Sequence, residues 1–165
     1  MEQTLISSMH DFPVELSTFL LAMTPIGELR LSIPIAITVY KMHPLAALLW
    51  SIAGNIGITI IVLFILEHGV EWLLRHSRKV EILWQRYIDN LRLKHAKNFD
   101  RWGAVALVLF VAVPIPLTGA ISGAIVASVF QIPIARALPL LTLGILIAGA
   151  IVTLLTLGIR GFFFL

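Results

Sequence analysis

Apolar residues fall into long blocks along this chain, and polar residues interrupt the blocks at only a few places. Two of the blocks, residues 45–66 and 138–159, contain no charged residue. As an α-helix each would be about 33 Å long, which is enough to cross a hydrocarbon core of ~30 Å. The pattern therefore predicts two membrane-spanning helices.

Shorter apolar pieces stand in pairs before each of these blocks. Residues 15–23 precede 26–40, with Pro25 between them and Gly27 just after it. Residues 104–113 precede 120–130, with Pro114, Pro116 and Gly119 between them. A nine-residue helix is about 14 Å long and covers only half of the bilayer core. Each pair therefore predicts either one broken spanning helix or a re-entrant hairpin. Thr24 is suited to cap the second piece of the first pair, and Pro25 is suited to its first turn.

The two halves of the chain align when the sequence is shifted by 89 residues. Pro25-Ile26 then falls on Pro114-Ile115, and Pro44-Leu45-Ala46 falls on Pro133-Ile134-Ala135. In both halves the broken piece comes first and the full span second. The alignment predicts an internal repeat, with repeat 1 at about 14–66 and repeat 2 at about 102–160.

The course of the broken pieces decides how the repeats are oriented. If the pieces are re-entrant, each half crosses the membrane once and the repeats are inverted; if they span, each half crosses twice and the repeats are parallel. Inverted repeats with discontinuous helices are a known transporter plan. The acidic N-terminal segment favours a location outside, opposite the basic loop, and hence the inverted arrangement. Lys41 and Arg160 would then lie outside, which argues the other way.

A charged segment, residues 67–101, joins the two halves and holds eight of the twelve basic residues of the chain. Apolar side chains recur in it at an alternating spacing of three and four residues, which predicts an amphipathic helix. These are Val70, Leu73, Val80, Trp84, Tyr87 and Leu91. By the positive-inside rule this linker is cytoplasmic.

Composition agrees with a single membrane domain over residues 1–165. Hydrophobic residues make up 59% of the chain and charged residues 13%, which argues strongly against a soluble protein. No cysteine is present, so disulfides and thiolate chemistry are excluded. We predict an all-α integral membrane protein of two inverted repeats, each a re-entrant broken-helix hairpin followed by one transmembrane helix, in the inner (plasma) membrane.

Glu28 and Arg30 are charged residues within the apolar part of repeat 1. A charge at membrane depth costs roughly 2.5–3.5 kcal/mol on insertion scales, so such residues usually mark a binding site or pathway. Two positions apart on a regular helix they would point about 200° away from each other and could not pair. We therefore expect each to meet a partner elsewhere. A purely structural salt bridge between helices is the alternative.

Helix-breaking residues accompany these charges and expose backbone groups. They are Pro25, Gly27, Pro34, Pro114 and Pro116. Proline leaves the carbonyl four residues earlier without its donor, and half-helix N-termini at one depth can hold an ion or an anionic group. Thr118 and Gly119 could add a hydroxyl and backbone N–H groups. Asn55 is either a ligand or a helix–helix hydrogen-bond donor, and the 89-residue shift places it opposite Gly144.

Other classes of function find little support in the sequence. The five histidines show no metal-ligand spacing, and no arrangement of residues recommends an enzyme or a cofactor site. The basic linker could suggest nucleic acid, but anionic lipid head groups explain it more simply. Because four segments are few to enclose a pathway, we expect a homodimer.

Specific motifs resemble those of a known family. Gly27-Glu28-Leu29-Arg30 with Ser32-Ile33-Pro34, then Gly54-Asn55, and in the second half Val113-Pro114 through Thr118-Gly119-Ala120 are similar to the bacterial and archaeal small multi-drug export proteins. That family is in turn similar to the DedA/VTT membrane proteins, which have paired re-entrant hairpins. The chain departs from the family at Pro116-Leu117, where a glycine more often follows the proline. The resemblance implies a transporter, with Glu28, Arg30, Pro114, Thr118 and Gly119 at the matching motif positions.

Together these features predict a secondary transporter that exports a small molecule, with Glu28 as the proton-coupling carboxylate. Arg30 would attract an anionic group or pair with a carboxylate. A flippase for a polyprenyl phosphate or phospholipid, with Arg30 on the head-group phosphate, is the first alternative. A non-transporting membrane scaffold, whose amphipathic helix recruits a partner, is the second.

Overall fold

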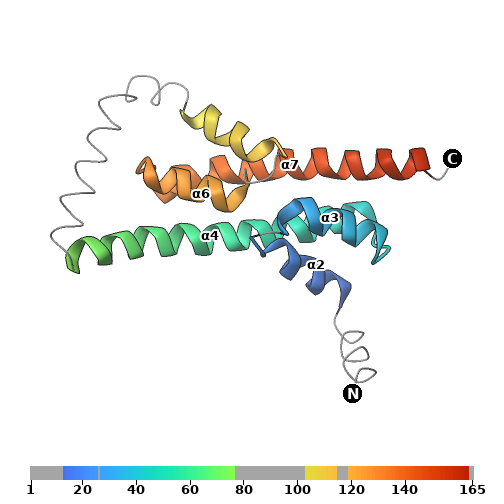
Figure 1. Cartoon of the computed structure of the whole chain (residues 1–165), viewed down its shortest axis with the longest axis horizontal. Helices are drawn as coiled ribbons and strands as arrows, with labels where there is room; N and C mark the ends of the chain where they lie inside the picture. Colours follow the sequence, from blue (N-terminus) through green and yellow to red (C-terminus); the bar gives the residue numbers. More distant parts are fainter. Residues whose placement is uncertain (1–12, 26, 77–102, 115–118, 164–165) are drawn as a thin grey trace, which may run out of the picture. The chain divides into compact units, whose positions relative to one another are not determined.

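The computed structural model describes residues 13–25, 27–76, 103–114 and 119–163, and these residues form helices and no β-strand. The first half contains α2 (Val14–Ala22), α3 (Glu28–Thr38) and α4 (Pro44–His76) (Figure 1). The second half contains a helix at Gly103–Ala112, then α6 (Ala120–Val129) and α7 (Ile134–Phe163). The all-α prediction is confirmed, and both broken pairs occur where prolines and glycines predicted them.

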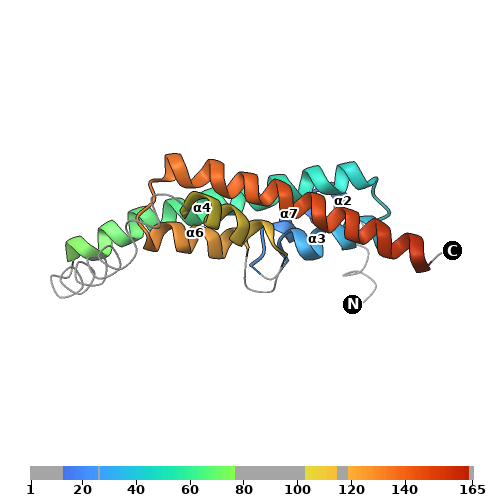
Figure 2. The same ribbon diagram turned by 90° about the horizontal axis from the view of Figure 1, so that it is seen from above.

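The two predicted spans are longer than the sequence pattern suggested. Pro44–Gly69 and Ile134–Ile159 are both 26-residue apolar stretches, with mean hydropathies of 2.2 and 2.5. α4 continues past residue 66 to His76, because the polar residues after Glu67 change the composition without introducing a helix breaker other than Gly69. α7 begins directly after Pro133 and runs through Pro139 (Figure 2). The remainder of the predicted amphipathic helix, 77–101, lies outside the described residues.

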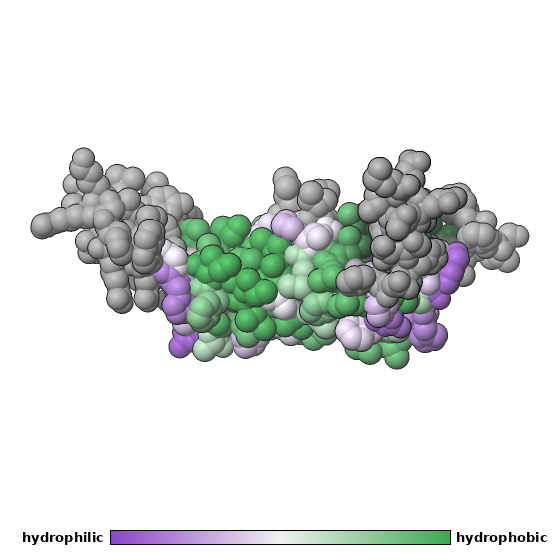
Figure 3. Space-filling view, turned by 90° about the horizontal axis from the view of Figure 1, so that it is seen from below, coloured by the Kyte–Doolittle hydropathy of each residue, from purple (hydrophilic) through white to green (hydrophobic). Residues whose placement is uncertain are grey.

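Apolar side chains cover the surface of these helices (Figure 3). Only 28% of the most apolar window of α4 and 39% of that of α7 is buried. The exposed side chains include Leu45, Leu49, Phe64, Ile65, Leu154 and Leu155. The core helix of a soluble protein would hide such residues, whereas lipid solvates them. The surface therefore indicates a membrane protein.

Two compact units divide the chain, and each contains one broken pair of helices. Unit 1 comprises residues 1–57 and 146–165, and unit 2 comprises residues 58–145. The boundary cuts both long helices, so that each unit holds the N-terminal part of one span and the C-terminal part of the other.

In unit 1, α2 and α3 lie side by side and α4 approaches them closely (Figure 1). Gly54 of α4 lies against the carbonyl oxygen of Phe19 and the Cβ of Ala22, so that no side chain fits there. On α7, Gly149 faces Leu48 of α4, where an added Cβ would lie 2.9 Å from the leucine side chain. Small residues allow this backbone approach, which is how helices pack in lipid.

Unit 2 is built in the same way from its own helices. A Cβ at Gly144 of α7 would lie 3.0 Å from the carbonyl oxygen of Val108 and 2.7 Å from the Cβ of Val111. A Cβ at Gly123 of α6 would meet Val111 at 2.6 Å and Leu141 at 2.7 Å. The helix Gly103–Ala112 is therefore packed on the span through glycine, as α2 is in unit 1.

The corresponding contacts support the repeat but correct its register in the spans. Phe19 and Ala22 correspond to Val108 and Val111 at the predicted shift of 89. The glycines that they meet, Gly54 and Gly144, are 90 apart. The buried positions 47, 51, 54 and 55 of α4 likewise match 137, 141, 144 and 145 of α7. The predicted pairing of Asn55 with Gly144 is therefore wrong, and Ile145 takes the matching place. The inverted orientation and the re-entrant course remain predictions.

Candidate functional site

The break between α2 and α3 is a tight turn built around Thr24. Its hydroxyl donates a hydrogen bond to the carbonyl of Leu21 at 2.8 Å and accepts one from the backbone N–H of Gly27 at 2.9 Å. A Cβ on Gly27 would collide with both Leu21 and Thr24, so the position requires glycine. The prediction that Thr24 caps the second helix is wrong, because α3 begins later than predicted, at Glu28, and its N-cap residue is Gly27. Thr24 instead stabilises the turn that precedes the helix.

Glu28 is the first residue of α3, and its side chain is only 9% exposed. Its backbone lies in the left-handed region, with φ of 37°, a conformation that non-glycine residues seldom adopt. Strained backbone of this kind concentrates at functional sites. Pro25, on the other side of the turn, is exposed.

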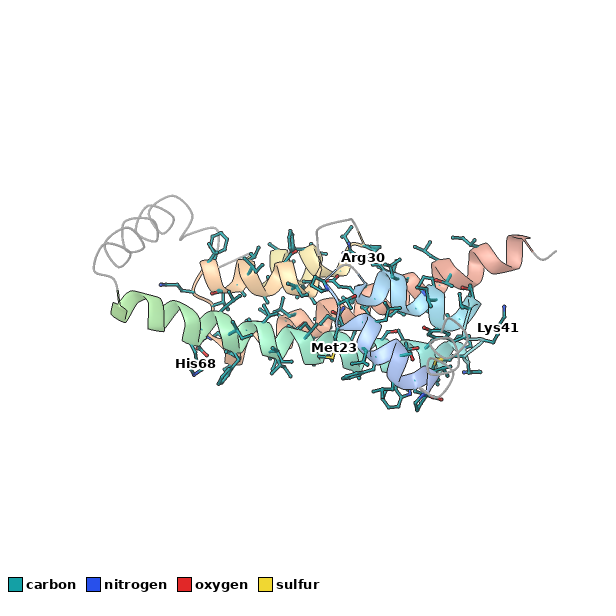
Figure 4. The ribbon with its side chains drawn as sticks, turned by 60° about the horizontal axis from the view of Figure 1, so that its bottom comes forward. Met23, Arg30, Lys41 and His68 are labelled. Carbon is teal, nitrogen blue, oxygen red and sulfur yellow. The ribbon has the colours of Figure 1, made fainter. Side chains whose placement is uncertain are left out.

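The charge of Glu28 acts on the guanidinium of Arg30. A coulombic effect does not require contact, so the statement that the two side chains cannot pair along one helix stays a prediction. The left-handed φ of Glu28 is a departure from regular helix geometry at the first of the two residues. Arg30 is half-buried on α3, across the break from Met23 at the end of α2 (Figure 4).

Pro34 lies inside α3 and cannot donate to the carbonyl of Arg30, as predicted. The carbonyl of Pro34 itself accepts a hydrogen bond from the hydroxyl of Thr38 at 2.6 Å. The helix nevertheless continues to Thr38, so Pro34 removes one backbone hydrogen bond from α3 without ending the helix.

A group of buried polar side chains connects α3 to α4 in unit 1. Ser32 and Ser51 are fully buried, and their hydroxyl oxygens are 2.8 Å apart in a hydrogen bond. Asn55 lies one turn after Ser51 and is 1% exposed. Its Oδ1 accepts no hydrogen bond from the described residues, although the residue makes other interactions. Glu28 lies one turn before Ser32 on the same buried face of α3. We call Glu28, Ser32, Ser51 and Asn55 the polar cluster.

Sequence reasoning named Ser32 only as part of the family motif and not as a site residue, and it missed Ser51. A signal was present, because Ser32 follows Glu28 by four positions and Ser51 precedes Asn55 by four, so that each shares a helix face with a predicted site residue. What the sequence could not supply is the contact between the two faces, which joins residues 19 positions apart.

The predicted residues of the second half belong to unit 2. Gly119 is buried and precedes α6 in an extended conformation, with φ of −158°. Pro114 is half-buried just after the helix Gly103–Ala112. Thr118 and Pro116 lie outside the described residues. The structure thus places the charge of Glu28 within electrostatic range of Arg30, and it describes Gly119 only within unit 2.

No group of three or more histidine, aspartate or glutamate side chains that could hold a metal ion occurs among the described residues. The chemistry of the site is that of one carboxylate, one guanidinium, two hydroxyls and an amide.

Comparison with known proteins identifies the family of this chain. No curated protein and no solved structure matches the chain. A family model matches residues 28–151, from the buried carboxylate of α3 to the middle of α7. The family carries the provisional description of small multi-drug export protein, and a protein of that description is a membrane transporter. Because the match covers about three quarters of its length, the chain belongs to the small multi-drug export protein family.

Proposed function

We propose that this protein is a secondary exporter of a small molecule, driven by protons that bind and leave Glu28. The observation that carries the proposal is a buried carboxylate beside a half-buried guanidinium, at a break between two short apolar helices. A carboxylate at membrane depth must be stabilised either by its surroundings or by a proton.

The surroundings of Glu28 suit both states. When the carboxylate is charged, Arg30 stabilises it, as does the N-terminal end of α3. When the site is desolvated, burial favours the protonated form. A group balanced between these forms can load and release a proton during a transport cycle. The strained φ of Glu28 is consistent with a residue that is held in place for its chemistry rather than for the helix.

In this proposal Asn55 would bind substrate or order the site at Glu28. Thr118 and Gly119 of the second half would supply a hydroxyl and backbone N–H groups at the other break. The prolines and Gly27 would hold the half-helices open. We further propose a homodimer in the inner membrane, with inverted repeats and the linker 67–101 on the cytoplasmic side.

Transport in proteoliposomes under an imposed pH gradient tests the coupling. With ethidium as the probe, the wild-type protein should move it at a rate that depends on the gradient and falls when a protonophore collapses it. Glu28→Gln keeps the size of the side chain but cannot bind a proton. The residual rate of ethidium transport by this variant should therefore not depend on the pH gradient. A wild-type ethidium flux equal in the presence and absence of the gradient would contradict proton coupling.

Three variants separate the rival functions. A flippase would need the bidentate phosphate contact of Arg30, so Arg30→Lys would abolish translocation of a fluorescent phospholipid although the charge is kept. A scaffold would retain its cellular phenotype in Glu28→Ala and lose it when residues 70–91 are deleted. An exporter predicts the reverse of the scaffold result, with Glu28→Ala inactive.

A further inference from the structure

The hydrogen bond between Ser32 and Ser51 fixes the register of α3 against α4 in unit 1. The two hydroxyl oxygens are 2.8 Å apart, and both side chains are fully buried. α3 ends at Thr38 and α4 begins at Pro44, so the chain reverses between them and the two helices run antiparallel (Figure 1). In an antiparallel pair, a step toward the start of α3 corresponds to a step toward the end of α4.

One helical turn from the two serines, this register brings Glu28 and Asn55 to the same level. Glu28 precedes Ser32 by four residues. Asn55 follows Ser51 by four residues. Four residues rise about 6 Å along a helix and return to nearly the same face. Glu28 is 9% exposed and Asn55 is 1% exposed, so both lie on buried faces, and the register places them opposite each other.

Contacts made by α2 place the start of α3 at this level independently. Gly54, the neighbour of Asn55 on α4, lies against the end of α2, where an added Cβ would be 3.0 Å from the Cβ of Ala22. The break that follows α2 is compact, because the N–H of Glu28 donates to the carbonyl of Thr24 at 3.1 Å. Glu28 is therefore held close to the end of α2, which is the part of unit 1 that meets residues 54 and 55.

We propose that the side-chain amide of Asn55 donates a hydrogen bond to the carboxylate of Glu28 and is the positioning residue of the proton site. An asparagine amide offers two N–H donors, and an ionised carboxylate can only accept. Such a donor stabilises the charged form and holds the carboxylate in one orientation, against the burial that favours protonation. The hydrogen bond between Ser32 and Ser51 keeps the amide at the level of the carboxylate. This inference rests on the proposed coupling at Glu28.

Few other ionisable groups lie near this pair in the described part of unit 1. The charges of Glu28 and Arg30 act on each other along α3. The ionisable residue of α2 is Glu15, in the first turn of that helix and far along it from the break. Residues 44–66 of α4 and 146–159 of α7 contain no charged side chain and no histidine. The turn beyond the other end of α3 holds Tyr40, Lys41 and His43. A change at position 55 therefore acts on Glu28 with Arg30 as the other charged group beside it.

Cysteine cross-linking tests the pairing, because the chain has no native cysteine. The double variant Glu28→Cys/Asn55→Cys should form a disulfide when membranes are treated with a mild oxidant. Ser32→Cys/Ser51→Cys is the reference pair and should do the same. Leu31→Cys/Asn55→Cys is the negative control, since Leu31 is 44% exposed on α3. Absence of the disulfide between positions 28 and 55, or its formation no faster than in the Leu31 control, would overturn the proposal.

The pH dependence of transport tests the role. Ethidium flux into proteoliposomes, measured over a series of pH values at a fixed pH difference, gives the pH at which transport is half-maximal. Asn55→Leu keeps the branching at Cγ but removes both donors, so this midpoint should move to higher pH by about one to two units. Thr18→Val is the matched control, because Thr18 is a fully buried hydroxyl that donates within α2 to the carbonyl of Val14 at 2.7 Å. A midpoint for Asn55→Leu equal to that of Thr18→Val would overturn the positioning role.

Exchanging the two groups gives the sharpest result. Glu28→Gln alone should lack flux that depends on the pH gradient. Combining it with Asn55→Asp returns one carboxylate and one amide to the pair and should restore that dependence, whereas a double variant as unresponsive as Glu28→Gln would argue against the pairing. If wild-type flux does not respond to the gradient, the proposed function fails, while cross-linking still decides whether Asn55 faces Glu28.

Discussion

The two units solve one packing problem with different chemistry. In each, a short helix lies against a glycine of a long helix, Gly54 in unit 1 and Gly144 in unit 2. Around these glycines, unit 1 buries hydroxyl, amide and carboxyl groups, whereas unit 2 buries leucine, isoleucine and glycine. Unit 2 also buries a hydroxyl, that of Thr59, so the difference lies at matching positions of the long helices, where Ser51 and Asn55 of unit 1 stand against Leu141 and Ile145 of unit 2.

The largest expected effects concern the packing that both units share. A Cβ at Gly54 would collide with the carbonyl oxygen of Phe19, a backbone atom that cannot rotate away. At Gly144 the nearest atom, the Cβ of Val111, would lie 2.7 Å away. We expect Gly54→Ala to lower the free energy of unfolding by about 3 kcal/mol or more and Gly144→Ala by about 1–3 kcal/mol. Thermal unfolding in detergent measures both.

Gly69→Ala is the control for this pair, because it lies on α4 with nothing within 4 Å of an added Cβ. There the better helix propensity of alanine should stabilise the protein by up to about 1 kcal/mol. If Gly54→Ala unfolds no earlier than Gly69→Ala, the close approach of α2 to α4 is wrong, and the comparison between the units loses its basis.

A second effect should separate the units at matching positions of the long helices. Leu141 is fully buried against Gly123, so Leu141→Ala leaves a cavity and should lower the free energy of unfolding by about 2–5 kcal/mol. Ser51→Ala removes only a hydroxyl group from a hydrogen bond in lipid and should cost less than about 1 kcal/mol.

The order of the two variants should be reversed when transport is measured instead of stability. In ethidium transport, Ser51→Ala should be strongly impaired at nearly unchanged stability, and Leu141→Ala should keep its rate per folded molecule. Equal losses of stability and of activity in the two variants would show that the hydroxyls serve packing after all.

Much of this fold could be predicted because the residues that begin and end its helices act locally. The ends of α2 and the position of the break before α3 are set by Pro13, Thr24 and Pro25, whose effects act within a few residues. The lengths of the apolar blocks predicted the spans for the same reason. α4 is longer than the predicted span, because the hydropathy pattern marks the end of the apolar residues and the helix continues beyond them.

The rest of the site depended on information that no local pattern contains. The contact between Ser32 and Ser51 joins two helices, and the pairing of Gly54 with Gly144 required three-dimensional packing to correct the alignment by one residue. The left-handed φ of Glu28 is a further feature that helical periodicity does not predict. Errors of this kind gather at the break, where the chain departs from regular geometry.

The smallest expected effect tests whether the turns of the two repeats are equivalent. Lys41 and Gln131 both have left-handed backbones, with φ of 55° and 54°, shortly after the second helix of each broken pair. The residue that follows each of them donates its N–H back into that helix, Met42 to Ala36 at 2.9 Å and Ile132 to Ala127 at 2.9 Å. Gln131 follows the C-cap residue Phe130 and so takes the usual glycine position of a helix C-terminus, whereas Lys41 lies one residue further from its C-cap residue, Val39.

Glycine at either place removes the steric penalty of a left-handed side chain, while its extra freedom in the unfolded chain offsets part of the gain. Lys41→Gly and Gln131→Gly should therefore each raise the free energy of unfolding by about 0.5–1 kcal/mol, by similar amounts, and leave ethidium transport unchanged. Thermal unfolding of the two single variants and the double variant measures this, and the gains should add because the turns are separate. A gain in stability at Gln131 with a loss at Lys41 would mean that the two turns are not equivalent.

Glu28, the other non-glycine residue with positive φ in the described chain, supplies the contrast. Relief of strain there by Glu28→Gly should stabilise the fold and abolish transport together.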